Sequence, residues 1–180
     1  MKSILLFLSC IIFIQDDNKA VLYEFTANKS ISDWIIVDDG VMGGISKGTI
    51  SLNENGDGLY TGDISTENNG GFSSVRLQFD NTKVTDYSAV LLKIKGDKKE
   101  YQFRIKSTSD QYYSYVNTFK TNGEWQEVRI PFNTFKPYFR GRLLDKKDYS
   151  GEIMAEVAFL IGNKKNESFQ LEISRISLVK

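Results

Sequence analysis

Two adjacent carboxylates, Asp38 and Asp39, stand immediately before a glycine-rich turn that contains Gly40, Gly43 and Gly44. Their hard oxygen atoms can ligate Ca²⁺, or they can accept hydrogen bonds from backbone N–H groups, as aspartates do in Asx turns. The spacing is not that of an EF-hand loop, and no third and fourth acidic residue accompanies the pair. We therefore expect a structural turn and no metal site, and we keep Asp38 as a candidate binding residue.

Two further stretches are richer in special residues than a plain scaffold requires. Gly70 and Gly71 open a predicted strand that contains Arg76, and a double glycine there permits a tight turn or a close backbone approach. The stretch is not a phosphate loop, because the Lys-Ser/Thr pair and the following helix are missing. Pro131 marks the end or edge of a later strand, and Arg140 follows it in a Phe-Arg-Gly-Arg sequence. Arg76 and Arg140 are candidate binding residues, with a structural ion pair as the alternative for Arg140.

Arg104 is the charged residue whose direction the sequence predicts most clearly. Tyr101, Phe103 and Ile105 alternate with polar residues, which is typical of a half-buried strand. Because neighbouring side chains in a strand point to opposite faces, Arg104 is expected to point away from the core. We count it among the candidate binding residues, since an outward arginine can contribute to a hot spot without filling the core.

A series of aromatic residues follows the same part of the chain and could stack against sugars or bases. Most of its members are explained as core residues at alternate strand positions, and Tyr112 and Tyr115 remain candidates for binding. The bulk of Trp125 predicts a buried packing position. The series is Tyr101, Phe103, Tyr112, Tyr113, Tyr115 and Phe119.

The residues that most enzyme mechanisms need are missing. The sequence has no histidine and a single cysteine, Cys10. This excludes Ser-His-Asp and Cys-His nucleophile systems, histidine proton shuttles, and zinc, haem or iron–sulfur sites built on those ligands. Carboxylate chemistry stays open, but no acid pair stands out for hydrolysis. We expect a protein that is not an enzyme and needs no cofactor.

Period-2 alternation of apolar and polar residues dominates after residue 20 and predicts an all-β fold. Turn signals rich in Gly, Asn and Asp separate the strands, whose regular spacing predicts a single β-sandwich or jelly-roll domain over residues 20–180. The stretch 133–151 lacks alternation, and we expect a long connection there with room for a turn of helix. The predicted strands are 21–25, 34–37, 47–52, 59–65, 71–79, 90–95, 101–106, 113–119, 125–131, 156–161 and 169–174.

Residues 1–19 have the pattern of a secretory signal. Lys2 precedes an almost wholly apolar run from Ile4 to Ile14, and polar residues follow from Gln15. This run is too short to cross a bilayer, which takes about 20 apolar residues. A buried N-terminal strand is the alternative. We expect an exported protein, periplasmic, in the cell envelope or secreted, whose mature chain has no cysteine and does not insert into a membrane.

Three stretches together resemble the complex I intermediate-associated protein family, the NADH:ubiquinone oxidoreductase assembly-factor domain. The matching text is WIIVDDGVMGGIS, then NNGGFSSVR, then WQEVRIPFNTF with RGR, in the same order and at matching spacing over about residues 22–178. The resemblance implies a galactose-binding-like jelly roll and a non-catalytic role, in mitochondrial members as a chaperone for complex I assembly. The N-terminus departs from those members, because it is not an Arg- and Ser-rich transit peptide.

The charge balance bears on the partner. Lys and Arg number 23 and so do Asp and Glu, which argues against binding to nucleic acid driven by charge. We expect a protein partner first and a carbohydrate second, since jelly rolls of this type often bind sugars. An exposed aromatic platform beside carboxylates would favour sugars, and a flat patch with Arg and Tyr anchors would favour protein. The candidate binding residues are Asp38, Arg76, Arg104, Tyr115 and Arg140.

Overall fold

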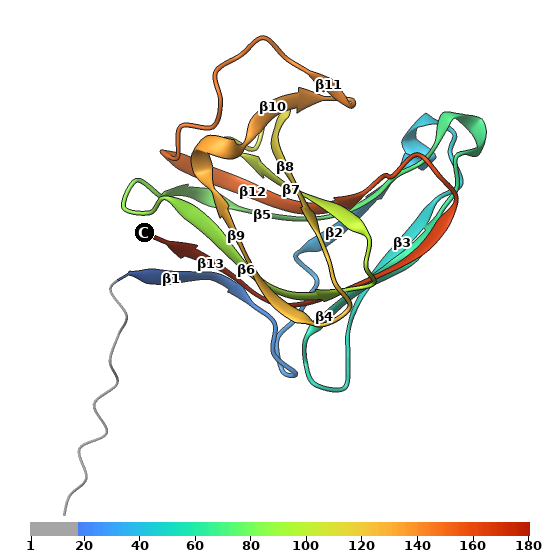
Figure 1. Cartoon of the computed structure of the whole chain (residues 1–180), viewed down its shortest axis with the longest axis horizontal. Helices are drawn as coiled ribbons and strands as arrows, with labels where there is room; N and C mark the ends of the chain where they lie inside the picture. The colour runs from blue at the N-terminus through green and yellow to red at the C-terminus, as the bar shows by residue number, and fades with distance from the viewer. Residues whose placement is uncertain (1–17) are drawn as a thin grey trace, which may run out of the picture.

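The computed structural model describes residues 18–180, which form two antiparallel β-sheets packed face to face (Figure 1). No helix in this part of the chain is long and apolar enough to cross a membrane. The strands are β1 (Lys19–Glu24), β2 (Trp34–Asp38), β3 (Lys47–Leu52), β4 (Gly58–Ile64), β5 (Ser73–Lys83), β6 (Ala89–Gly96), β7 (Glu100–Lys106), β8 (Ser114–Lys120), β9 (Trp125–Pro131), β10 (Lys136–Phe139), β11 (Arg142–Leu143), β12 (Ile153–Ile161) and β13 (Glu167–Val179). Three short 3₁₀ helices are η1 (Asp39–Met42), η2 (Glu67–Asn69) and η3 (Phe132–Thr134).

The two sheets differ in the number and order of their strands. The six-stranded sheet has the order β3-β4-β13-β6-β9, with β1 also paired to β13. Its long strand β13 bonds to β4 through Glu167–Ile173 and to β1 through Arg175–Val179. The seven-stranded sheet has the order β11-β10-β8-β7-β12-β5-β2. The predicted all-β sandwich is confirmed.

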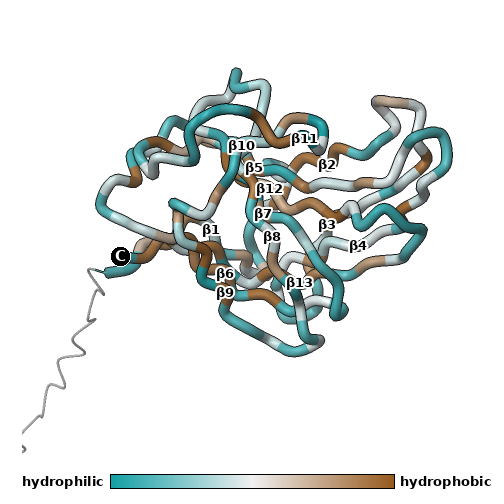
Figure 2. The backbone as a smooth tube through the Cα atoms, turned by 45° about the horizontal axis from the view of Figure 1, so that its top comes forward, coloured by the Kyte–Doolittle hydropathy of each residue, from teal (hydrophilic) through white to brown (hydrophobic). Residues whose placement is uncertain are grey.

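The core lies between the sheets and is rich in aromatic rings. Tyr101, Phe103 and Ile105 on β7 are at most 1% exposed, as their alternation predicted. The Phe103 ring meets that of Phe159 edge to face, with the centroids 5.1 Å apart. Figure 2 shows the consequence along the chain, with apolar stretches in the strands of both sheets and hydrophilic residues in most connecting loops.

Strand β12 breaks the rule of alternate burial. All of its residues from Met154 to Ile161 are buried, although every second side chain points away from the core. Glu156, Ala158 and Leu160 have this outward direction and are 2%, 2% and 5% exposed. β12 is an inner strand of the seven-stranded sheet, so the side chains of β7 and β5 flank it on both sides. The outward side of this sheet is therefore a polar surface on which the side chains of β12 are buried among their neighbours.

Two sequence expectations are corrected here. The stretch 133–151 is not merely a connection with a turn of helix, since it contributes β10 and β11 to the edge of the seven-stranded sheet. These strands are too short to show alternation, which is why their pattern gave no signal. Trp125 is 40% exposed at the start of edge strand β9, so it is not a buried packing residue. The predicted signal segment, 1–19, lies outside the described residues except for Asn18 and Lys19, and Lys19 begins β1.

The carboxylate of Asp39 ties three separate segments together. Asp39 is fully buried and accepts hydrogen bonds from Ser46 N at 3.0 Å, Gly71 N at 2.6 Å and Phe72 N at 3.2 Å, and also from the Ser46 hydroxyl. Burial opposes its charge, but these hydrogen bonds outweigh burial and lower the pKa of Asp39. We call this cluster the Asp39 turn. Its carboxylate has the structural role that the sequence favoured over metal binding.

Candidate functional site

The outward side of the seven-stranded sheet, which we call the outer face, carries its side chains in rows across the strands, three of which lie around its centre. The register places Arg76 on β5, Ala158 on β12 and Arg104 on β7 in one row. The same row continues to Val116 on β8 and Lys136 on β10. We call it the arginine row. Three cationic side chains thus lie in one line across the sheet, with two small apolar residues between them.

The rows on either side are polar and partly buried. One contains Gln78, Glu156 and Lys106, and it leads towards Tyr138 on β10. The other contains Ser74, Leu160 and Gln102, and it leads to Thr118 on β8.

The arginines of the central row are held by their neighbours in sequence. Arg104 donates from Nε at 3.0 Å and from Nη2 at 2.6 Å to the Gln102 side-chain oxygen. Arg76 donates from Nε to the Ser74 hydroxyl at 3.1 Å, and Ser74 in turn donates to Val37 O. Both bonds join residues two apart on one strand, where side chains share a face. Each guanidinium therefore lies along its own strand in a fixed direction.

One carboxylate lies on the outer face beside the arginine row, and it already has partners. Glu156 accepts a hydrogen bond from the Gln78 amide at 2.8 Å and pairs with Lys106 Nζ at 3.4 Å. Burial and, after it, the charge of Arg76 lower the pKa of Arg104 to about 10, with Glu156 opposing both effects. The outer face therefore has an excess of positive charge around its centre.

A groove with two lobes runs over this surface. The central lobe has a volume of about 310 Å³ and lies over Arg104, Val116 and Thr118, with Lys136 and Tyr138 on its far side. β10 and β11 lie beyond β8 at the edge of the sheet (Figure 1), and Lys136, Tyr138 and Gly141 from this segment line the lobe.

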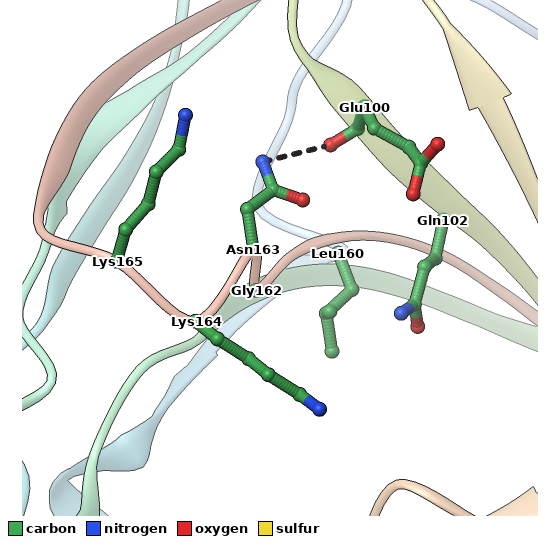
Figure 3. A pocket seen from close by; sticks show the side chains of 7 residues that line it. All are labelled: Glu100, Gln102, Leu160, Gly162, Asn163, Lys164 and Lys165. Carbon is green, nitrogen blue, oxygen red and sulfur yellow. Dashed lines mark hydrogen bonds between the residues drawn. The ribbon is translucent and has the colours of Figure 1, made fainter.

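The edge lobe has a volume of about 490 Å³ and lies where β12 ends and β7 begins. Lys164, Leu160 and Gln102 extend to the same side of the ribbon, whereas Lys165 extends to the other (Figure 3). The Asn163 amide donates to Glu100 O at 3.3 Å and fixes the turn against β7. Gln102 lines both lobes, so the two adjoin.

The structure brings together some of the predicted binding residues and separates others. Arg76 and Arg104 lie in one row of the outer face. Arg140 is exposed in the β10–β11 turn, with its guanidinium 5.3 Å from the Phe139 ring, next to the groove residue Gly141. Its left-handed backbone, with φ of 47°, belongs to that turn.

Asp38 and Tyr115 lie elsewhere. Asp38 accepts a hydrogen bond from Gly48 N at 3.0 Å at the end of β2, and its register partner is the buried Ser73. Tyr115 is paired with Ile105, on the core side of the sheet, and its ring lies 5.2 Å from that of Tyr149. Neither side chain reaches the outer face.

Several residues of the groove carried no sequence signal. Gln102 and Thr118 are ordinary polar positions of alternating strands, and Lys136 and Tyr138 belong to the unpredicted β10. Lys164 stands in a turn. Their importance arises from the strand order, which no local pattern reveals. The outer face can donate many hydrogen bonds and can attract an anion, but its carboxylate is already paired.

Comparison with known proteins identifies relatives in sequence. The sequence model of a family described as complex I intermediate-associated protein 30 matches residues 23–173. The mitochondrial complex I intermediate-associated protein 30 of Mus musculus is 24% identical over 88% of this chain and 55% of its own length. A probable mitochondrial counterpart from Caenorhabditis briggsae is 24% identical over 92% of this chain and 56% of its own. The chain thus spans about half the length of these relatives.

Comparison of structures identifies neighbours in fold. The family 11 carbohydrate-binding module of Clostridium thermocellum, solved in complex with a β-1,3-1,4-mixed-linked tetrasaccharide, has a TM-score of 0.65 and 17% identity, covering 90% of this chain and 95% of that one. A family 29 carbohydrate-binding module has a TM-score of 0.53 and 9% identity, covering 89% of this chain and 90% of that one. At such identities the likeness establishes the fold, a galactose-binding-like β-sandwich.

Proposed function

Because the chain belongs to the complex I intermediate-associated protein 30 family, we propose that it is a non-catalytic binding module that holds a protein partner on the outer face of its seven-stranded sheet. The observation that carries the proposal is the groove itself. It joins two adjoining lobes of about 310 and 490 Å³, and Arg104, whose direction is fixed by Gln102, lines the central one. By analogy with its mitochondrial relatives, the module assists the assembly of a larger complex.

The composition of the groove supports a protein partner. Arginine and tyrosine are enriched at the centres of protein interfaces, and both occur here, as Arg104 and Tyr138. Val116 and Leu160 supply apolar floor between the polar groups. An arginine whose direction is fixed loses little side-chain entropy on binding.

We also propose that the protein acts outside the cytoplasm. The support is the N-terminal pattern of Lys2 followed by the apolar run from Ile4 to Ile14. A fusion of residues 1–19 to a reporter enzyme that is active only after export tests this directly. Activity is expected with the native segment and not when charged residues interrupt the run. Equal reporter activity for both versions would contradict export.

A carbohydrate is the second candidate ligand, and the fold likeness favours it. The family 11 module, with a TM-score of 0.65, was solved with a bound tetrasaccharide. A linear groove that is rich in hydrogen-bond donors suits a sugar chain as well as a peptide. The groove has little aromatic surface for stacking a sugar ring, since Tyr138 is the one aromatic side chain among the residues that line its two lobes.

Site-specific photo-crosslinking in the native cell tests the proposed surface. A photoreactive amino acid would replace Thr118, which is exposed in the central lobe, or Lys93, which is exposed on the outward side of the six-stranded sheet. We expect one dominant protein adduct from position 118 and none from position 93. Excess unlabelled protein should compete the adduct away. Equal adducts from both positions, or none from position 118, would overturn the proposal.

A glycan array run on the same protein separates the second candidate. Binding of a soluble oligosaccharide that blocks crosslinking at Thr118 would move the assignment to carbohydrate. Binding that leaves the adduct at Thr118 unchanged would place the sugar elsewhere and leave the protein partner in the groove.

A further inference from the structure

The arginine row has hydrogen-bonding capacity that the protein does not use. A guanidinium has five N–H donors. Arg104 uses Nε and Nη2 on Gln102, and Arg76 uses Nε on Ser74. Within residues 18–180, the Nη1 group of Arg104 and both Nη groups of Arg76 have no hydrogen-bond partner. These donors are fixed in direction and face the same surface.

The row also brings the two charges close together. β5 and β7 are separated by β12 alone, so the two arginine backbones lie roughly 10 Å apart, twice the usual strand spacing. Ala158 stands between them and contributes a methyl group, which leaves the space above it to the guanidinium groups. Long side chains at this separation can reach one small ligand group together.

Within residues 18–180, neither Arg76 nor Arg104 forms an ion pair with a carboxylate, although Glu156 favours the charge of Arg104. Glu156, in the adjacent row, is bound to Gln78 and Lys106. The charge of Arg76 and burial both act against the charge of Arg104. A bound anion would relieve this repulsion. The attraction between an added carboxylate and the two guanidinium groups would also be stronger here than on an open surface, because the surroundings are partly desolvated.

We propose that Arg76 and Arg104 form a two-arginine clamp for a carboxylate side chain of an acidic, extended peptide segment in the partner protein. This inference rests on the proposed function, because it names the chemistry of the partner in the same groove. Lys164 lies at one end of the groove and offers a further cation to an acidic residue beside the clamped one, whereas Lys136 at the other end is already paired with Asp148 at 2.6 Å. Apolar floor at Val116 and Leu160 accommodates small side chains between the charged groups.

The groove favours a peptide over an acidic sugar chain. Pyranose rings bind best where their apolar face stacks on an exposed aromatic ring. The floor of this groove is aliphatic, with Val116 and Leu160 at 8% and 5% exposure, and Tyr138 stands at its wall. Planar guanidinium groups match carboxylates in a two-bond geometry.

Titration with a defined probe tests the clamp. The probe is a fluorescent peptide of alternating glutamate and serine, and its control has glutamine in place of each glutamate. In low salt, we expect the glutamate peptide to raise the fluorescence anisotropy and the glutamine peptide to have no effect. Arg104→Gln and Arg76→Gln should each weaken binding by about tenfold or more. Arg104→Lys should also weaken it, because lysine keeps the charge and loses the fork.

Matched controls test whether binding of the peptide is specific to the arginine row. Lys93→Gln removes a cation from the outward side of the other sheet and should leave the affinity unchanged. Nuclear magnetic resonance of the unmodified protein gives a readout that does not depend on any variant folding. The Nε–Hε signals of Arg76 and Arg104 should shift with the peptide, whereas that of Arg129, on the other sheet, should not.

Three results of the binding titrations would overturn the clamp. The first is equal binding, or no binding, of the glutamate and glutamine peptides. The second is unchanged affinity in Arg76→Gln/Arg104→Gln. The third is an oligogalacturonate, which carries its carboxylates on sugars, binding in preference to the peptide. If the crosslinked adduct at Thr118 persists in the double variant, the clamp is wrong and the protein-binding surface stands; if Thr118 gives no adduct in the unmodified chain, both fail.

Discussion

The Asp39 turn and the arginine row both hold charge out of water, and they satisfy it differently. Asp39 is a buried anion whose oxygens are occupied by donors from Ser46, Gly71 and Phe72. Arg76 and Arg104 are partly buried cations that use some of their donors on neighbours and leave others without a partner on the outer face. The first arrangement fixes loops in place, and the second leaves hydrogen-bond donors free to bind a ligand.

The difference follows from where the charges lie. Asp39 is at a crossing of loops, where backbone N–H groups lack strand partners and need an acceptor. The arginines lie on a regular sheet, where every backbone group is already paired with the next strand and offers no acceptor. A charge on a sheet face must be matched by side chains or by a ligand. The following variants are ordered from the largest expected effect on stability to the smallest.

Asp39→Ala should give the largest loss of stability. It leaves the N–H groups of Ser46, Gly71 and Phe72 without their acceptor, and a buried unpaired donor costs about 1–3 kcal/mol. We expect a loss of about 3–5 kcal/mol in the free energy of unfolding, measured in urea. Asp38→Ala is the control, since Asp38 accepts the Gly48 N–H alone among the bonds observed, and it should cost about 1 kcal/mol.

The pH dependence of Asp39 has a definite sign. Its pKa is lowered in the folded protein, so its contribution to stability is present above the pKa of the unfolded chain and is lost as pH falls through the folded value. The unmodified protein should therefore lose stability more steeply in acid than Asp39→Ala. Parallel acid profiles for the two proteins would show that the carboxylate is not the group responsible.

Glu156→Gln should lower stability and tighten binding of the acidic peptide. Removing the carboxylate leaves Lys106 without its ion-pair partner on a face where Glu156 is 2% exposed, and we expect a loss of about 2–3 kcal/mol. The same change makes the outer face more positive, so the affinity for the glutamate peptide should rise. Denaturation and anisotropy measured on one preparation separate the two effects. A fall in affinity would mean that Glu156 positions the arginines.

Much of the fold is predictable from the sequence because it depends on local alternation. The strand 101–106 is an example, since its buried and outward residues follow from period 2 alone. The two arginines could be chosen because each is a charge in a strand next to core residues. That Arg76 and Arg104 share a row could not be predicted, because it depends on β12 lying between β5 and β7. Strand order is set by long-range packing.

The position of Tyr115, whose face the sequence left open, and that of Trp125, whose burial it predicted wrongly, have physical reasons too. Tyr115 belongs to an aromatic series whose faces the sequence could not assign, and register with Ile105 directs it to the core side. Trp125 is large enough to predict burial, but it begins an edge strand, where one side has no neighbour. Side-chain size thus predicts burial less well at the edge of a sheet than in its middle.

Trp125→Ala tests how much a large side chain on an edge strand contributes to stability. A buried tryptophan would cost about 3–5 kcal/mol on truncation. At 40% exposure, we expect a loss near 1 kcal/mol in the free energy of unfolding, and no change in binding of the acidic peptide. The matched comparison is Trp34→Ala at 5% exposure, which should reach the larger range. Similar losses for both tryptophans would show that β9 is held more tightly than its edge position suggests.

Tyr115→Phe should have the smallest effect and compares the two sides of one sheet. The Tyr115 hydroxyl lies 3.2 Å from that of Tyr113, so its removal should cost about 0.5 kcal/mol. Burial, followed by Tyr113, raises the pKa of Tyr115 to about 12, so the difference from the unmodified protein should narrow as pH rises from about 10 to about 12. Tyr138→Phe, in the wall of the groove, removes the same atom from the opposite face. Peptide affinity should fall with Tyr138→Phe and stay unchanged with Tyr115→Phe, and the reverse result would show that the partner binds on a surface other than the outer face.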